Sequence, residues 1–282
     1  MYPVHCSFQK SKGMEVIGID ISKDTFDVWN SSTGHTQFVN DKNGFKSFLK
    51  TLNQDDHCVM EATGCYHVQL ASFIYESDIK ISVVNGLIIK RFIQMKMKRT
   101  KTDKSDAKMI CMFGQEQQPV GWEPEPAFIE ESKLELTLIS LYIKQSTQLK
   151  NKLHNLYSGG ITNGVMISSL KLQLKRTIKE IEKLEKSVEQ IFKAEAPQEL
   201  SNSMSIPGIG KKTALLILVN TNMFRDFYAP RQVVAYVGLA PVDRKSGSSL
   251  RGRSYISKMG NPMLRNHLFM CSFTASKHWP TM

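Results

Sequence analysis

Four carboxylates in this sequence have the spacing of a metal site: Asp20, Glu61, Asp103 and Asp106. The first two each end an apolar run of strand type, and the last two are three residues apart, on one face of a predicted helix. Taken singly, each has an ordinary alternative: a turn residue, a solvent-exposed strand end, or acids favoured by a helix N-terminus. Together they favour a site for Mg²⁺, because carboxylates crowded together repel one another unless a cation lies between them.

A serine far along the chain is the second chemical candidate. Ser246 lies in a glycine-rich loop, and residues 244–265 contain six basic residues and no acid: Arg244, Lys245, Arg251, Arg253, Lys258 and Arg265. A serine in such a loop can attack a phosphodiester, because the cations stabilise the developing phosphorane charge and a base or metal can activate the hydroxyl. On chemistry alone, a loop that only grips phosphate is favoured.

Further basic residues indicate a nucleic-acid partner. The segment 90–108 is strongly basic, and residues 206–214 match the hairpin of a helix-hairpin-helix element, whose backbone N–H groups can hold a phosphate. The alternative for the second segment is a purely structural helix–turn–helix corner. The side chains predicted to contact nucleic acid are Lys101, Lys104, Lys211, Lys212, Arg251, Arg253, Lys258 and Arg265.

The bulk properties agree with this partner. The chain has 282 residues, a formal net charge of +11 and a pI near 9.3, which favours nucleic acid first and an anionic membrane second. A merely soluble basic protein is the alternative. Five scattered cysteines argue for a reducing cytoplasm and against a zinc ribbon. No apolar run is long enough to span a bilayer, and residues 1–13 lack a signal-peptide core, so we expect an extension there.

The periodicity of apolar residues predicts the elements that position these groups. Three strands are expected within residues 14–39, then a helix over 43–52, a strand from His57, a helix over 66–77, a strand over 79–84 and a helix over 86–95. An opening hairpin followed by alternating strands and helices is the order of an RNase H-like α/β fold. We therefore expect an α/β domain over residues 14–118.

The rest of the chain is expected to be mainly helical. A proline-rich linker at 119–127 precedes two long helices, 129–157 and 168–194. Apolar residues at 170, 174, 181, 184, 188 and 191, interrupted only by Thr177, form a coiled-coil seam. We predict an antiparallel helical hairpin over 119–196 that could dimerise, with a solvated spacer as the alternative, and a mainly α C-terminal domain over 197–282.

Five motifs in order carry a family resemblance. They are Gly18-Ile-Asp20, Glu61-Ala-Thr-Gly64, Lys101-Thr-Asp103-Lys-Ser-Asp106, Ile206-Pro-Gly-Ile-Gly210, and Gly238-Leu-Ala-Pro241 followed by Ser246-Gly247 and Leu264-Arg265. With these motifs, residues 14–277 resemble the Piv/MooV DNA invertases and the related insertion-sequence transposases. These are recombinases that combine a serine with a RuvC-like DEDD metal site.

The resemblance implies roles for the candidates. Asp20, Glu61, Asp103 and Asp106 would form the DEDD tetrad for Mg²⁺ or Mn²⁺, and Ser246 would be the nucleophile, with Ser248 and Ser249 as alternatives. It also implies a DNA transposase of the bacterial cytoplasm, associated with the nucleoid. Insertion-sequence members use a structured bridge RNA to select donor and target DNA. They assemble from dimers into a tetramer, in which the metal site of one subunit completes the serine site of another.

Two alternatives remain open. The first is a RuvC-like nuclease or junction resolvase, in which water is the nucleophile and Ser246 only grips phosphate. The second is a truncated remnant that binds nucleic acid without recombining it. The second alternative rests on a departure from the family, whose members usually continue beyond the point where this chain ends, at Met282.

Overall fold

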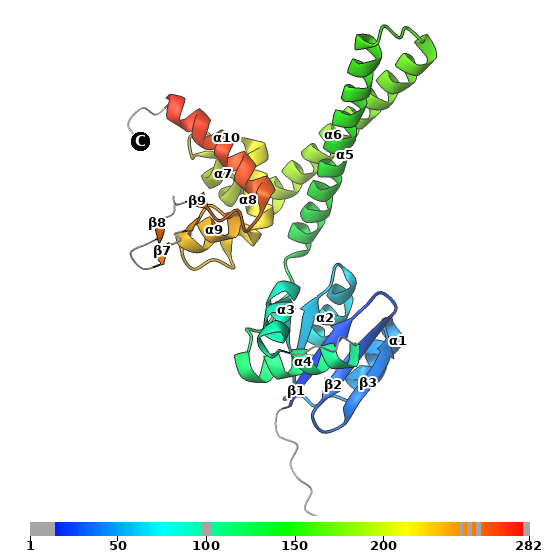
Figure 1. Ribbon diagram of the computed structural model, residues 1–282, viewed down its shortest axis with the longest axis vertical. Helices are drawn as coiled ribbons and strands as arrows, with labels where there is room; N and C mark the ends of the chain where they lie inside the picture. Colours follow the sequence, from blue (N-terminus) through cyan, green and yellow to red (C-terminus); the bar gives the residue numbers. More distant parts are fainter. Residues whose placement is uncertain (1–14, 98–102, 243–244, 247–249, 252–254, 279–282) are drawn as a thin grey trace, which may run out of the picture. The chain divides into compact units, whose positions relative to one another are not determined.

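The computed structural model describes residues 15–97, 103–242, 245–246, 250–251 and 255–278, with only the backbone described at 103–104, 245–246, 250–251 and 278 (Figure 1). Internal contacts divide the chain into two compact units, Met1–Pro124 and Glu125–Met282. The first unit is a mixed α/β domain and the second is mainly helical. The predicted helical hairpin therefore belongs to the same compact unit as the C-terminal region.

A five-stranded sheet forms the centre of the first unit. The strands are β1 (Val16–Ile21), β2 (Thr25–Asn30), β3 (Gly34–Val39), β4 (His57–Ala62) and β5 (Lys80–Asn85). They lie in the order β3-β2-β1-β4-β5. The first three strands form an antiparallel meander, whereas β4 runs parallel to β1 and β5 runs parallel to β4. The expected hairpin and alternating strands and helices are confirmed at the level of a mixed α/β unit.

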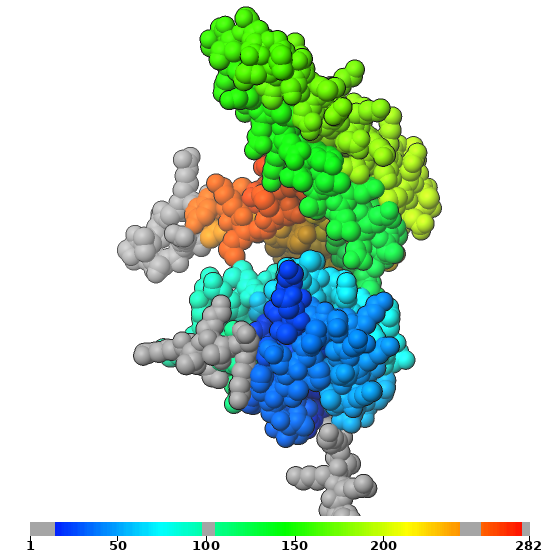
Figure 2. All heavy atoms as spheres, turned by 90° about the vertical axis from the view of Figure 1, so that its right-hand side faces the viewer, coloured from blue at the N-terminus to red at the C-terminus, as the bar shows by residue number. Residues whose placement is uncertain are grey.

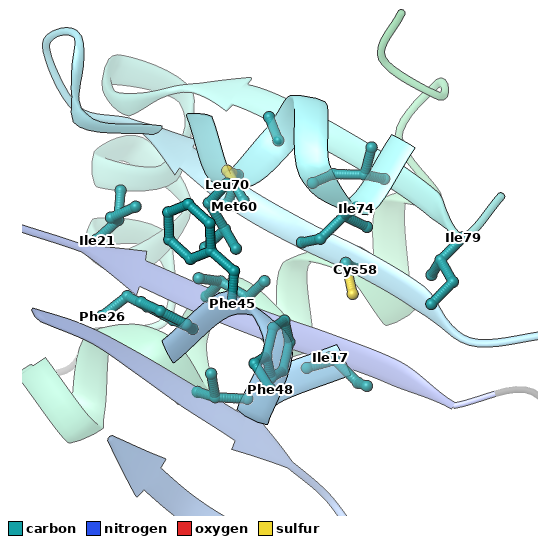
Figure 3. Packing of buried hydrophobic residues seen from close by; sticks show 14 residues of the cluster. Ile17, Ile21, Phe26, Phe45, Phe48, Cys58, Met60, Leu70, Ile74 and Ile79 are labelled. Carbon is teal, nitrogen blue, oxygen red and sulfur yellow. The ribbon is translucent and has the colours of Figure 1, made fainter. Parts of the chain in front are cut away.

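One face of this sheet carries the larger core. Every second residue of β1 is apolar and buried on this face, and the helices α1 (Lys42–Leu49) and α2 (Tyr66–Glu76) pack against it. Figure 3 shows Phe26, Phe45 and Phe48 clustered beside Ile17. Full burial of such side chains contributes about 1.5–3 kcal/mol each. This core fixes the register of the strands, because a slip by one residue would turn the apolar set to the other face.

The opposite face of the sheet is covered by α3 (Gly86–Met95) and α4 (Asp103–Gln117), with Met109, Ile110 and Phe113 of α4 buried against it. Helix α4 lies unusually close to β1. A Cβ placed on Gly18 would lie 2.1 Å from the carbonyl oxygen of Ala107 and 2.3 Å from the backbone nitrogen of Cys111. Gly18 therefore allows a backbone approach that no other residue permits.

This contact gives a stability prediction. We expect Gly18→Ala to destabilise the first unit by about 1–3 kcal/mol or more, because both clashing atoms belong to the α4 backbone and cannot rotate away. The matched control is Gly121→Ala, since the nearest atom to a Cβ there is 3.9 Å away. Chemical unfolding of both variants measures the difference. Equal stabilities would show that α4 is free to shift on the sheet.

The linker after α4 is attached to the edge of the sheet. The Trp122 backbone N–H donates to Ile81 O at 2.7 Å, and the Ser82 hydroxyl donates to the carbonyls of Pro119 and Val120. The same hydroxyl lies 2.8 Å from His57 Nε2. Burial, helped by nearby Lys80, lowers the pKa of His57 to about 4. The imidazole is therefore neutral at physiological pH and can donate its Nε2 proton to Ser82.

The second unit consists mainly of helices, with four short strands between the last two. The helical elements are α5 (Ala127–Ser158), α6 (Gly164–Glu195), α7 (Pro197–Met204), α8 (Lys211–Asn220), η1 (Asn222–Phe224), α9 (Pro230–Val237) and α10 (Pro262–His278). Helices α5 and α6 are joined by a short turn and lie against each other along their length (Figures 1 and 2). None of the helices in the described part of the chain is long and apolar enough to cross a membrane.

The predicted seam of α6 faces α5 within the same chain. Seam positions from Leu170 to Ile191 are buried or half-buried, including Thr177, whose hydroxyl donates to Gln173 O at 2.9 Å. Toward the base of the hairpin, Val188 and Phe192 join a core with Ile129 of α5 and with α7 and α8. The prediction that this hairpin could also dimerise stays a prediction.

Candidate active site

Asp20 and Glu61 are neighbours on the sheet. Strands β1 and β4 are parallel and pair Ile19 with Met60, so the residues that follow, Asp20 and Glu61, come next in register. Both are half-buried, and both lie on the face opposite the larger core, near the carboxyl ends of their strands. The predicted position of both carboxylates at strand ends is therefore observed.

Helix α4, which packs against β1, carries the second pair of acids. Asp106 directly precedes Ala107, the residue whose carbonyl lies against Gly18 of β1, and it is half-buried. Asp103 begins the helix, so its backbone lies one turn earlier; its side chain is outside the described residues. The close approach of α4 to β1 thus places the backbone next to Asp106 against Gly18.

The backbone of Gly86 lies directly against the carboxylate of Glu61. A Cβ placed on Gly86, the first residue of α3, would lie 2.5 Å from Glu61 Oε1. The preceding residue, Asn85, caps the helix by accepting a hydrogen bond from the Leu87 N–H at 2.8 Å. The start of α3 therefore forms a tight backbone wall beside Glu61, a feature that the strand pattern did not predict.

All the proposed donors are carboxylate oxygens, which are the ligands that Mg²⁺ and Mn²⁺ prefer. Within the residues whose side chains are described, no three His, Cys, Asp or Glu side chains are grouped closely enough to hold a metal ion. The three described members of the predicted tetrad, Asp20, Glu61 and Asp106, therefore do not form such a group, and the fourth proposed ligand is Asp103. The donor chemistry therefore fits a divalent metal, and the four-ligand geometry stays a prediction.

A further acid lies beside the predicted tetrad. Asp27 of β2 pairs in register with Asp20, and it is only 5% exposed. Its carboxylate accepts hydrogen bonds from His35 Nε2 at 2.6 Å and from the Gln37 amide at 3.2 Å, both on β3. A row of polar groups thus crosses the sheet from Gln37 to Glu61. The signal in the sequence was an acid at an inward-facing position of an alternating strand.

The candidate serine lies in a β-arm of the second unit. Two short ladders are nested along the chain: β6 (Pro241–Val242) pairs with β9 (Tyr255–Ile256), and β7 (Lys245–Ser246) pairs with β8 (Leu250–Arg251). Ser246 is opposite Leu250 and is the last residue of β7. The backbone of Ser246 is therefore at the end of the β7–β8 ladder that is farther along the arm from β6 and β9. Its side chain, and all of Ser248 and Ser249, lie outside what the structure describes.

The predicted helix-hairpin-helix region forms a helix–turn–helix between α7 and α8. Gly208 in this turn has φ of +84°, and a Cβ there would lie 2.5 Å from Cys271 O of α10. Lys211 and Lys212 open α8, and they form ion pairs with Glu189 and Glu185 of α6, at 2.8 Å and 2.7 Å. Hydrogen bonds from Lys193 and Lys211 lower the pKa of Glu189 to about 2. Phosphate would have to compete with these glutamates for both lysines.

The other predicted nucleic-acid contacts differ in how they are placed. Arg265 donates from Nη1 to Val237 O at 2.8 Å, so one end of its guanidinium holds the end of α9. Lys258 is exposed and has a positive φ of 56°. Lys101 and Arg253 are outside the described residues, as are the side chains of Lys104 and Arg251. The phosphate roles of all of these residues stay predictions.

Two family models match the chain. One, described as "Transposase" and built on DEDD transposases of the IS110 type, matches residues 17–159, half of the chain. The other, described as "Transposase IS116/IS110/IS902 family", matches residues 201–282. The chain belongs to the IS110-type transposase family. The first match covers every residue of the predicted tetrad, and the second covers Ser246 and the β-arm.

Individual relatives in this family extend over most of the chain. The pilin gene-inverting protein of Moraxella bovis is 29% identical over 266 residues, which are 90% of this chain and 80% of the relative. The transposase for insertion sequence element IS1111A of Coxiella burnetii is 24% identical over 292 residues, covering 91% and 76% of the two chains. As an IS110-type transposase the protein is a DNA recombinase, and DEDD transposases in general depend on a divalent metal.

Proposed function

We propose that this transposase cleaves and rejoins DNA through a covalent link to Ser246. The serine hydroxyl attacks a phosphodiester, the bond from phosphorus to the leaving nucleoside oxygen breaks, and that oxygen takes a proton. A hydroxyl of the new partner strand then attacks the phosphoserine and releases the serine. Because each step exchanges one phosphate ester for another, rejoining needs no nucleotide cofactor. The matches to transposase family models in both units support this proposal.

The first unit would supply an RNase H-like, RuvC-like metal site in this reaction. The strand order β3-β2-β1-β4-β5, with an antiparallel meander followed by two parallel strands, supports that fold. Asp20, Glu61, Asp103 and Asp106 would hold Mg²⁺ or Mn²⁺. When bound, such an ion polarises phosphoryl oxygens and stabilises the leaving oxygen. The neighbouring Asp27, whose carboxylate is hydrogen-bonded to His35, would limit the movement of side chains next to Asp20 on the sheet.

A recombination assay tests the proposal against a non-catalytic remnant. We expect the purified chain to join two DNA sites of its element in Mg²⁺, without a nucleotide, and to stop in EDTA. Absence of product in Mg²⁺ with its element's DNA and all RNA of the producing cell present would contradict the proposal. Cleaved but never rejoined ends would instead favour a metal-dependent nuclease that uses water.

We also propose that a structured RNA selects the DNA and that the working assembly is built from dimers. The net charge of +11 supports a polyanionic partner, and the resemblance to insertion-sequence transposases supports RNA in that role. A discrete RNA recovered from the purified protein, and a sedimentation mass above that of the 32.0 kDa monomer, are the expected results. Purification of an active, RNA-free monomer would contradict both.

A further inference from the structure

The charges of the α5–α6 hairpin are segregated along its length. Residues 136–179, the distal half, contain seven lysines and arginines and no acid. The base of the hairpin, residues 125–135 and 180–195, contains nine glutamates and four lysines. The formal charge is thus +7 in the distal half and −5 at the base. The basic residues of the distal half are Lys144, Lys150, Lys152, Lys171, Lys175, Arg176 and Lys179.

These seven side chains are all exposed, and none forms an ion pair with an acid that the structure describes. At the base, in contrast, Lys133 pairs with Glu125 and Lys193 pairs with Glu189. Part of the charge at the base is therefore paired within the fold, whereas the distal charge has no described acid opposite it. A solvated helical face usually mixes both signs of charge, and this one does not.

Part of the distal charge forms a regular row. Lys171, Lys175 and Lys179 are four residues apart, so they lie along one face of α6 and span about 12 Å. The seam residues Leu174 and Thr177 are half-buried or buried toward α5, so this row lies on the outer face of α6. Lys171 also lies 5.8 Å from the ring centre of Tyr157, which is 52% exposed.

The distal half projects beyond the rest of the second unit. The core shared with α7 and α8 uses Ile129, Val188 and Phe192 at the base. Of the distal half, only its first residue, Leu136, belongs to the side chains packed against the described cores. Figure 1 shows the turn between α5 and α6 far from α7–α10, and Figure 2 shows the distal surface uncovered on the face in view. From residue 136 to the end of α5 is about 33 Å, close to one turn of B-DNA.

We propose that the distal half of the hairpin, residues 136–179, binds the phosphate backbone of double-stranded DNA. This rests on the proposed function, in which DNA is the substrate. Clustered lysines without acids provide the electrostatic term of DNA binding, which gives affinity but reads no sequence. A second copy of the hairpin fits this surface poorly, because two such halves would bring +7 against +7. The hairpin thus has two roles: its base packs against α7 and α8, and its distal half binds DNA phosphates.

The test compares two triple variants of the full chain. Lys171→Gln/Lys175→Gln/Lys179→Gln removes the row, and glutamine keeps a similar helix propensity. The control is Lys42→Gln/Lys46→Gln/Lys50→Gln on α1 and its C-cap, where the lysines have the same four-residue spacing and exposure but follow the acid Asp41. Both variants lose the same net charge. Binding of a labelled 30-base-pair duplex, and of an RNA duplex of equal length, is measured in EDTA at several salt concentrations.

We expect the row variant to bind the DNA duplex at least about tenfold more weakly near 0.1 M salt. Its plot of log affinity against log salt should be shallower by about 2–3, since each lost phosphate contact removes about 0.9. The α1 variant should stay within about twofold of wild type. Equal losses in both variants, no loss in the row variant, or a loss for RNA alone would overturn the inference.

The same measurements separate this inference from the proposed function. If wild type binds the DNA duplex and the row variant matches it, only the role of the hairpin is wrong. If wild type binds no DNA at all, the proposed function fails and the inference fails with it. A changed sedimentation mass with unchanged DNA binding would assign the surface to contacts between copies of the chain, which also overturns the inference.

Discussion

Replacing Ser246 by alanine is expected to abolish the covalent protein–DNA adduct and all recombinant product while DNA binding and metal binding persist. A nucleophile has no substitute in the site, so its loss removes the covalent step completely. A hydroxyl that only grips phosphate would contribute about 1–3 kcal/mol, so its loss would slow the reaction about ten- to a hundredfold. The size of the effect therefore distinguishes a recombinase from a nuclease that uses water.

Denaturing electrophoresis of end-labelled donor DNA after incubation with Mg²⁺ measures this effect. The matched control is Ser272→Ala, an exposed serine of the same unit on α10, whose hydroxyl contacts only Phe269 O in the described structure. It should behave like wild type. An adduct that persists in Ser246→Ala would move the nucleophile to another serine of the loop, with Ser248 and Ser249 tested next.

Neutralising Asp20 or Glu61 is the second change with a large expected effect. Asp20→Asn and Glu61→Gln keep the side-chain shape but remove a metal-binding charge, so we expect strand cleavage to fall below detection. The fold should be retained, because both residues are half-buried at strand ends and lie outside the apolar cores. Crowded carboxylates also repel one another without a cation, so neutralising one relieves that repulsion.

Thermal unfolding with and without Mg²⁺ separates the loss of metal from the loss of fold. Wild type should be stabilised by Mg²⁺, because a ligand that binds only the native state raises the free energy of unfolding, and the two variants should lose that increment. Asp24→Asn is the control, since Asp24 is an exposed acid in the turn after β1. Full activity of wild type in EDTA, or of either variant in Mg²⁺, would show that these carboxylates are not metal ligands.

The sequence predicted the elements of the first unit closely, because their apolar periodicity records which face is buried. The strand from His57 and the helix over 66–77 appear as β4 and α2, with ends that differ by one or two residues. The placement of Asp20 and Glu61 at strand ends followed from the same pattern. That they are adjacent in register depends on β1 pairing with β4, which periodicity does not report.

Contacts between distant segments were the part that could not be predicted. Gly86 against Glu61, and Asp27 held by His35, depend on which elements meet in space. The seam of α6 indicated that one line of that helix packs against the preceding long helix, but not that α7 and α8 cover its base. The ion pairs of Lys211 and Lys212 with glutamates of α6 could not be predicted for the same reason. The sequence alone places these two lysines at the start of a helix but does not say which acids lie opposite them.

The most direct test of the central claim is to identify the residue that becomes joined to DNA. Wild-type protein is trapped on donor DNA in Mg²⁺, digested with nuclease and protease, and its nucleotide-linked peptide is sequenced by mass spectrometry. We predict a single linked peptide with the nucleotide on Ser246, and none when the reaction contains EDTA. Cleaved DNA ends without any linked peptide, or a nucleotide attached outside residues 245–250, would contradict the account.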